Sequence, residues 1–569
     1  MKKINITING KETTAEEGEK LIDALTKNKI NVPTLCKNQH LDPVGACRLC
    51  VVEIEGAPKL VASCTTPARD GMNIKTHSQK VIKSRRLNIE LLLANHNKDC
   101  TSCSQNLNCK LQRYSEELMI NEIRFEGEKR KSKIDNSSIS IKRDNSKCVL
   151  CEQCYRTCNE IQTVYAIGQQ NRGFQTKVAP PFNLNMKESS CVNCGQCVIH
   201  CPTGALSEQN NVRKVAEALA TNKILIAQTA PSIRATLGEL LDIKPGISVT
   251  GKMVAALKEL GFQKVFDTDL AADITIVEEA AEFVKRYKNK KDLPMITTCC
   301  PAWIKFAEQY FFEQLNYMSS CRSPQAMMAS LIKTYWAEKN KIKPEDIILV
   351  DIMPCTAKKY EINRPEFKGD ADYVLTTVEL AKLIKQHNIN FKELQEQEFD
   401  NPLGESTGAG VIFGRSGGVM EAALRTAADM ITNKDIQNIE YKKIRGLETA
   451  KEATITIEDE EIKICVVHTL GEARKIMNKI REGESPYHFI EIMACYGGCI
   501  GGGGQPRYES DEALQKRAQA LETEDKNKKI RKSHQNPSVI KLYKEYLGEF
   551  GGKRAHKLLH TTYEEKEAI

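Results

Sequence analysis

The sequence predicts a multidomain protein in which small cysteine-rich α+β modules precede one large α/β body. The chain has 569 residues, which at about 150 residues per domain suggests roughly four domains. Fifteen of its 22 cysteines lie before residue 202, and seven lie after it. From about residue 210 onward, helical stretches alternate with short apolar strands, the pattern of an α/β fold.

The composition is that of a folded protein, with 41% hydrophobic and 27% charged residues, which excludes a disordered or fibrous chain. No apolar stretch follows the two N-terminal lysines, and no apolar run reaches the 18 or so residues of a membrane helix. We therefore expect a cytoplasmic protein that does not contact a membrane. In a reducing compartment, clustered thiolates favour metal binding over disulfides.

The net charge of +8 is a mild basic excess. It is consistent with an ordinary solvated surface, and a basic docking face for an acidic redox partner is the alternative. No basic stripe is interleaved with stacking aromatic residues, so we expect no nucleic-acid partner.

Residues 1–80 combine short β-type runs with the spacing Cys36-x10-Cys47-x2-Cys50-x13-Cys64. This spacing differs from the plant-type ferredoxin pattern, yet it keeps four thiolates within one β-rich unit. It predicts a [2Fe–2S] cluster, and structural zinc is the alternative.

Residues 81–120 are predicted to be mostly helical and contain His96-x3-Cys100-x2-Cys103-x5-Cys109. By spacing alone, these four side chains could hold zinc. Their position between two iron–sulfur modules favours a [4Fe–4S] cluster with one histidine ligand and three cysteine ligands.

Residues 121–147 form a polar, lysine-rich connector, and residues 148–209 contain a duplicated C-x2-C-x2-C-x3-C run. This is the pattern of a bacterial two-cluster ferredoxin, in which the fourth cysteine of each run ligates the other cluster. One [4Fe–4S] cluster is therefore assigned to Cys148, Cys151, Cys154 and Cys201, and the other to Cys191, Cys194, Cys197 and Cys158.

The body, residues 210–569, contains four strand-like runs that each lead to proline or cysteine. The runs are 224–227 before Ala230 and Pro231, 294–297 before Cys299 and Cys300, 347–352 before Pro354 and Cys355, and 489–493 before Cys495. Sites in α/β sheets form at the carboxyl ends of strands, so we expect these residues to converge. The charged tail from about residue 511 reads as a helical cap.

The order of the modules resembles the N-terminal half of modular [FeFe] hydrogenases, and its first two modules also resemble the iron–sulfur subunit of respiratory NADH dehydrogenase. Three segments of the body resemble the three [FeFe] hydrogenase signatures: TTCCPAW at 297–303, MPCTAKKYE at 353–361, and EIMACYGGCI at 491–500, which continues into GGGGQP. The resemblance is to the monomeric, ferredoxin-linked clostridial type and covers essentially the whole chain.

This resemblance implies four domains: a β-grasp [2Fe–2S] ferredoxin domain (1–80), a small His/Cys3 cluster domain (81–125), a two-cluster ferredoxin domain (126–209) and an H-cluster domain (210–569). It implies a ferredoxin hydrogenase that interconverts H2 with two protons and two electrons. The implied cofactors are one [2Fe–2S] cluster, three accessory [4Fe–4S] clusters and the H-cluster, a [4Fe–4S] cubane joined to a diiron subsite with CO, cyanide and azadithiolate. The implied partners are ferredoxin or a similar low-potential carrier, and hydrogenase maturation proteins.

The same resemblance implies the site residues. Cys300, Cys355, Cys495 and Cys499 would hold the cubane, Cys499 would bridge to the diiron subsite, and Lys358 would hydrogen-bond a cyanide. The glycines at 497–498 and 501–504 suit close backbone approach to a cluster, and a mobile surface loop is the alternative. The residues that match pocket-lining positions are Ala230, Pro231, Ser232, Ser323, Gln325, Met353, Pro354, Phe413, Gly414 and Met493.

Cys299 would donate and accept the proton, since a thiol pKa near 8.5 lies close to neutrality; a spare buried cysteine is the alternative. The resemblance continues the proton path through Glu279, Ser319, Glu282 and Arg286. On spacing alone, residues 279, 282 and 286 share one helix face, and an exposed charged face is the alternative. Arg415 with Ser416 departs from the family pattern and would place a charge near the pocket.

Two other functions remain as alternatives. One is a subunit of an NAD-linked, electron-bifurcating hydrogenase. The other is a non-catalytic H2 sensor or iron–sulfur assembly protein. These assignments use 20 of the 22 cysteines. Cys321 and Cys465 are left over, and we interpret both as core thiols.

Overall fold

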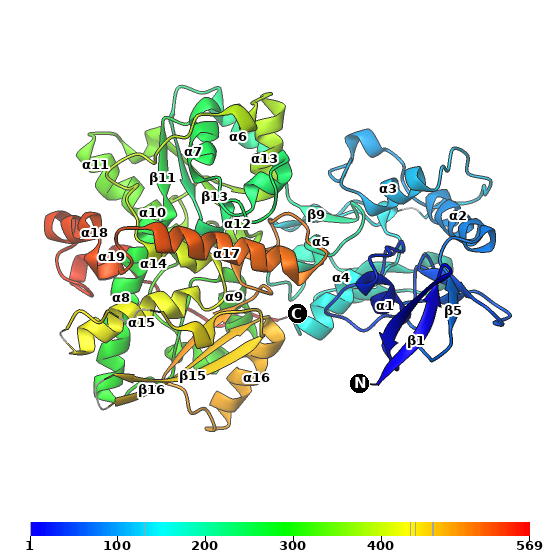
Figure 1. The fold of residues 1–569 in the computed structure, drawn as a ribbon. Coiled ribbons are helices and arrows are strands. Elements are labelled where there is room, and N and C mark those ends of the chain that lie inside the picture. Colours follow the sequence, from blue (N-terminus) through cyan, green and yellow to red (C-terminus); the bar gives the residue numbers. More distant parts are fainter. Residues whose placement is uncertain (1, 131, 433, 438–439, 458–459, 569) are drawn as a thin grey trace. The chain divides into compact units, whose positions relative to one another are not determined.

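The computed structural model describes residues 2–130, 132–432, 434–437, 440–457 and 460–568. Within it the chain forms two compact units, coloured along the sequence in Figure 1. The smaller unit contains Met1–Glu160, Tyr165–Ser189 and His200–Ser207, and the larger contains Ile161–Val164, Ser190–Ile199 and Glu208–Ile569. Among the described residues, no helix has both the length and the apolar character needed to cross a bilayer.

The smaller unit begins with a five-stranded mixed sheet in the order β2-β1-β5-β3-β4. Its strands are β1 (Lys3–Ile8), β2 (Lys11–Glu16), β3 (Val51–Ile54), β4 (Val61–Ala62) and β5 (Asn73–Lys75). Alternate side chains of β1 (Ile4, Ile6, Ile8) are buried and pack with Leu21 and Leu25 of α1 (Leu21–Lys27). This period of two is the signature of a strand that buries one face.

The rest of the smaller unit contains short elements around its cysteines. They are α2 (Gln79–Ala94), α3 (Lys110–Glu117), α4 (Gln153–Arg156) and the antiparallel pair β7 (Gly168–Gln170) and β8 (Lys177–Ala179). Ser78 begins α2, where its hydroxyl accepts a hydrogen bond from Val81 N, a standard N-cap.

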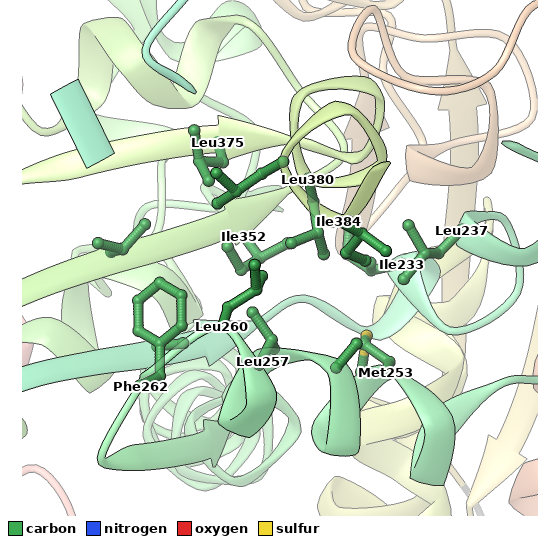
Figure 2. Close-up of a cluster of buried hydrophobic side chains, with 14 of the residues drawn as sticks. Ile233, Leu237, Met253, Leu257, Leu260, Phe262, Ile352, Leu375, Leu380 and Ile384 are labelled. Carbon is green, nitrogen blue, oxygen red and sulfur yellow. The ribbon is translucent and has the colours of Figure 1, made fainter. Parts of the chain in front are cut away.

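The larger unit contains a parallel sheet in the order β11-β10-β13-β14. Its strands are β10 (Ile224–Thr229), β11 (Lys264–Asp267), β13 (Ile347–Met353) and β14 (Tyr373–Thr376). Helices α7 (Thr250–Glu259) and α13 (Thr377–Gln386) cover one face. Figure 2 shows the resulting core, where Ile352 and Leu375 of the strands meet Leu257, Leu380 and Ile384 of the helices.

A second sheet in the larger unit has the order β12-β17-β16-β15. It contains β12 (Met295–Ile296), β15 (Ala450–Ile457), β16 (Glu460–His468) and β17 (Phe489–Met493). The pair β15–β16 is antiparallel and the other pairings are parallel. The four strands expected to converge therefore divide between two sheets, β10 and β13 in the first and β12 and β17 in the second.

Helix α8 (Thr268–Asn289) connects the cores of these two sheets. Leu270 and Ile274 pack into a cluster with Ile226 of β10, while Ile276 and Phe283 pack into another that includes β12 and β17 residues. Burial on both faces is typical of a central helix. The helix extends at both ends beyond residues 279, 282 and 286, which were expected to share one of its faces.

The C-terminal segment contains α17 (Asp511–Asn527), α18 (Pro537–Leu542) and α19 (Lys553–Leu559). Leu514 and Leu521 of α17 pack with Ala235, Val411 and Ile500. This segment thus covers the loops that follow β10 and β17.

Candidate active site and cluster sites

The four cysteines expected to hold the cubane lie at the ends of elements of the larger unit. Cys300 precedes α9 (Pro301–Tyr310), Cys355 follows β13, Cys495 follows β17, and Cys499 begins a 3-10 turn. Burial raises the pKa of each thiol, and neighbouring thiols of the set raise those of Cys355, Cys495 and Cys499 further. The structure therefore brings the four sulfurs together in a buried site. Thiolates are stable there only when a cation compensates their charge.

The glycine-rich run after Cys495 is packed and buried rather than a surface loop. A Cβ on Gly502 would lie 2.4 Å from Pro354 O, and one on Gly498, which has φ +86°, would lie 2.5 Å from Ser416 N. Both positions need glycine because another backbone occupies the space of a side chain. The run thus brings main chain close to the cysteine set, as a cluster cradle requires.

Lys358 anchors the polar side of the pocket. Its ammonium donates to Glu361 Oε2 at 2.7 Å, to Ser323 Oγ at 2.8 Å and to Cys299 O at 3.4 Å. Burial lowers the pKa of Lys358, but the Glu361 carboxylate outweighs that effect and the pKa lies above its ordinary value. Lys358 is therefore a buried, fixed cation beside Cys299, suited to an anionic group such as a cyanide.

Gln325 has a buried side-chain amide, 2% exposed, whose nitrogen and oxygen find no hydrogen-bond partner. A buried orphan amide costs free energy unless a ligand satisfies it. This side chain is therefore suited to hydrogen-bond a polar cofactor bound in the pocket.

The other expected pocket residues lie at strand ends and helix starts, and all except the half-buried Pro231 are buried. Ala230, Pro231 and Ser232 follow β10, and Ser323 and Gln325 lie at the start of α10 (Pro324–Leu331). Met353 and Met493 end β13 and β17, and Pro354 follows β13. Phe413 and Gly414 lie in the turn Ile412–Gly414.

The five residues of the expected proton path form a series of neighbouring groups. Burial, followed by the charge of nearby Glu279, raises the pKa of Cys299. Burial likewise raises the pKa of Glu279 to about 8, and among the described residues neither of its buried carboxylate oxygens has a hydrogen-bond partner. Ser319 Oγ lies 3.4 Å from Glu282 Oε2, and Arg286 Nη2 donates to Glu282 Oε1 at 2.5 Å. Because Glu282 and Arg286 side chains are each 15% exposed, the series runs from the pocket to solvent.

Arg415 is buried and its charge is compensated. Its guanidinium forms ion pairs with Glu421 at 2.5 Å and with Glu522 at 3.2 Å. The departure from the family pattern at this position therefore does not leave an unpaired charge beside the pocket.

Gln505 is a positioning residue that the sequence reasoning did not single out. Its Nε2 donates to Cys499 O at 3.1 Å and to Ser232 Oγ at 3.2 Å, and its Oε1 accepts from Thr236 and Thr377 hydroxyls at 2.7 Å each. It fixes the backbone of Cys499, the cysteine expected to bridge the cubane and the diiron subsite. Its position directly after four glycines was the available signal.

In the smaller unit, one cavity is lined by Cys148, Cys151, Cys154 and Cys201, the set expected for one [4Fe–4S] cluster. Nearer the N-terminus, the sulfurs of Cys36 and Cys47 lie 3.4 Å apart, and the thiols of Cys50 and Cys64 are hydrogen-bonded to each other.

His96 is 8% exposed, and its Nδ1 has no hydrogen-bond partner. Burial lowers the pKa of His96 to about 4, so the ring is neutral, as a metal ligand must be. The residues present at these sites fit iron–sulfur clusters.

Of the ligands expected for the second [4Fe–4S] cluster, Cys158 belongs to the smaller unit, whereas Cys191, Cys194 and Cys197 belong to the larger. There, Thr356 Oγ1 donates to Asn193 O at 2.7 Å. The charge of Cys194 also raises the pKa of Cys495. The loop that contains Cys194 therefore lies close to Cys355 and Cys495, two of the cysteines expected to hold the cubane.

Gly503 makes this contact through backbone alone, because a Cβ there would lie 2.5 Å from Cys194 O and 2.6 Å from Gly195 Cα. We expect Gly503→Ala to push the two loops apart and to slow electron delivery to the catalytic site. Gly127→Ala is the control, since nothing lies within 4 Å of its Cβ position. The measurement is H2 evolution with a protein electron carrier for both variants; equal rates would contradict the expectation.

Five family descriptions match the chain in series. "Iron only hydrogenase large subunit, C-terminal domain" matches residues 223–503, and "Iron hydrogenase small subunit" matches 511–566. Upstream, a 2Fe-2S binding domain matches 1–79, an NADH-ubiquinone oxidoreductase iron–sulfur region matches 85–124, and a 4Fe-4S dicluster domain matches 122–205.

Several relatives are similar over much of the chain. The NADP-reducing hydrogenase subunit HndD of Solidesulfovibrio fructosivorans is 46% identical and covers 100% of both chains. Iron hydrogenase 1 of Clostridium pasteurianum is 38% identical and covers 98% of this chain and 99% of its own. The solved structure of apo [FeFe]-hydrogenase HydA1 from Chlamydomonas reinhardtii is 39% identical, with a TM-score of 0.57, over 63% of this chain and 100% of its own.

Proposed function

Because the chain belongs to the [FeFe] hydrogenase family, with an H-cluster domain and accessory 2Fe-2S and 4Fe-4S domains, we propose that it catalyses reversible H2 formation with ferredoxin as its external electron carrier. The observation that carries the proposal is the series of neighbouring groups from Cys299 to Arg286, which begins next to Cys300 and ends at partly exposed side chains. A redox site with its own proton route is what the reaction requires.

When bound, the H-cluster supplies the redox-active iron at which H2 is formed and split. The residues of the chain supply its surroundings. Lys358 presents a fixed positive charge, and Gln325 presents an unpaired amide. The apolar side chains of Met353, Phe413 and Met493 exclude water from the pocket, which strengthens these polar interactions.

The thiol of Cys299 is the group that exchanges a proton with the cofactor. Burial keeps it protonated at neutral pH, so the thiol donates a proton and regains one from the Glu279 carboxyl. Ser319, which lies near Glu279, donates to Glu282, and Arg286 fixes the Glu282 carboxylate near solvent. Hydroxyl and carboxyl groups in contact can each accept one proton and release another.

The rate of H2 evolution is expected to fall as pH rises through about 8, because Glu279 then loses the proton that its raised pKa retains. Below that pH the carboxyl is protonated and can resupply Cys299. Glu279→Gln should abolish this alkaline limb while lowering the maximal rate. The measurement is a pH–rate profile with a viologen donor; an unchanged alkaline limb in Glu279→Gln would assign it to another group.

The identity of the electron carrier is the finer part of the proposal. The full-length similarity to Iron hydrogenase 1 supports a single-chain enzyme. The similarity to an NADP-reducing hydrogenase subunit favours a second candidate, in which this chain passes electrons to a partner subunit that reduces pyridine nucleotide.

Two assays on anaerobically matured protein test both. Infrared bands of CO and cyanide should appear, and reduced ferredoxin should drive H2 evolution by the isolated chain. Absence of both would refute hydrogenase function. The second candidate would be established if the isolated chain were active with viologen but not with ferredoxin, and if NADPH-dependent H2 evolution required a co-purifying flavoprotein.

A further inference from the structure

A buried cluster of ligand-type side chains lies beside the outer end of the proton route. One ligand atom from each of Glu282, Cys321 and His560 lies within 4.8 Å of the others. The side chain of Glu282 is 15% exposed, whereas Cys321 and His560 are 0% and 7% exposed. The residues come from α8, from the segment before α10, and from the segment after α19.

The backbone places two of the three ligands side by side. Cys321 and His560 form an antiparallel β-bridge, and the flanking hydrogen bonds, 2.8 Å each, put them in the non-hydrogen-bonded register. Side chains are closest in that register, with Cα atoms about 4.5 Å apart. The thiol and the imidazole therefore share one face by construction.

His560 is oriented as metal-binding histidines are. Its Nε2 lies 2.9 Å from Glu278 Oε2, and Glu278 is itself held by Tyr543 OH and by Gly551 N at 2.9 Å. Nδ1 lies 2.8 Å from Ser320 Oγ, which in turn donates to Glu282 Oε2 at 2.9 Å, so an ion bound by both ligands would take the place of this hydroxyl between them. A carboxylate that holds the distal nitrogen is the usual outer-shell partner of a histidine ligand.

The charges and the chemistry select the ion. Burial raises the pKa of Cys321, and the carboxylates of Glu279, Glu282 and Glu278 raise it further. A divalent cation would relieve this accumulation of negative groups and let the thiol ionise, releasing one proton. One sulfur, one imidazole nitrogen and one carboxylate oxygen are ligands that zinc prefers, with ligand atoms about 3.5 Å apart around it.

We propose that Glu282, Cys321 and His560 form a Zn²⁺ site, and that an ion bound there withdraws the Glu282 carboxylate from proton transfer. The inhibitory half rests on the proposed function, because it requires Glu282 to carry protons. The binding half does not, since it depends only on the three ligands. Cys321 is then a ligand rather than the core thiol that its burial alone suggested.

Equilibrium dialysis of the matured enzyme against Zn²⁺ tests the binding half, with zinc and iron both quantified. We expect one tightly bound zinc per chain at unchanged iron content, and a short zinc–sulfur distance near 2.3 Å by X-ray absorption. Cys321→Ala and His560→Gln should each lose that equivalent. Glu278→Gln should weaken binding about 10–100-fold.

Two controls separate this site from surface or cluster binding. Cys465 is the other unassigned buried cysteine, and His556 is exposed and stacks on His560 at 4.6 Å. Cys465→Ala and His556→Ala should keep the tight zinc. Equal binding by Cys321→Ala, His560→Gln and the unaltered enzyme would overturn the proposal.

Turnover tests the inhibitory half. Zinc should lower H2 evolution on the order of 100-fold, a chelator should restore it, and Cys321→Ala should be resistant. Zinc that binds through Cys321 and His560 without slowing turnover would overturn the inhibitory half and the place of Glu282 in the proton route, while the metal site would stand. Absence of tight zinc from an otherwise active enzyme would overturn the site and leave the proposed function intact.

Discussion

Replacing Cys299 with alanine is expected to lower H2 turnover by at least about 100-fold while the clusters remain in place. The thiol is the group of the route nearest the cysteine set, and its pKa is raised by burial and by Glu279. General acid–base groups contribute roughly 10²–10⁴ in rate. The measurement is H2 evolution at saturating donor, with infrared spectra and iron content confirming an assembled site.

The matched control for this variant is Cys465→Ala, which removes a buried thiol in β16 remote from the proton route. It should keep its activity. Cys299→Asp, which restores an ionisable group, should recover part of the rate. Full activity of Cys299→Ala with an intact infrared spectrum would remove Cys299 from the mechanism.

Replacing Glu421 with glutamine is expected to lower the free energy of unfolding of the larger unit by about 3–5 kcal/mol. Glu421 is 0% exposed and forms ion pairs with Arg415, Arg425 and Arg445 at 2.5–2.8 Å. Removing the carboxylate leaves three guanidinium groups around a neutral amide. Denaturant unfolding of the anaerobic protein measures the change, and the exposed pair of Glu217 with Arg213 supplies the control, since Glu217→Gln should cost at most about 1 kcal/mol.

Acid should reproduce the Glu421 effect. Burial raises the pKa of this carboxyl, but Arg415 and Arg445 outweigh it and lower the pKa from 4.5 to about 2. A lowered folded-state pKa contributes stability above the unfolded value, and that stability is lost as pH falls from about 4.5 toward 2. Glu421→Gln should lack this part of the acid dependence; an identical acid profile in both proteins would exclude Glu421 as its source.

Local signals predicted which cysteines lie together. Cys148, Cys151 and Cys154 lie within one short segment, so their spacing alone specifies a shared site, and the structure places them with Cys201 around one cavity. The strand ends before Cys300, Cys355 and Cys495 were likewise readable from apolar runs that lead to proline or cysteine.

Contacts between segments that are far apart in the sequence could not be predicted from the sequence. The apolar runs do not show that β10 and β13 belong to one sheet and β12 and β17 to another, because all four strands are buried and have the same hydrophobic pattern. The pairing of Arg415 with Glu522, and the bridge between Cys321 and His560, depend on where α17 and the C-terminal segment pack. Sequence spacing cannot encode such contacts.

The glycine contact between Gly503 and the Cys194 loop has a consequence for how electrons reach the cubane. Tunnelling rates fall steeply with distance, and here the spacing between the two cysteine loops is set by two main chains touching, with no side chain between them. Substitutions elsewhere in either loop can alter charge or reduction potential without lengthening the gap. The driving force of this electron-transfer step can therefore change by substitution while the distance between the two cysteine loops stays fixed by the contact of their main chains.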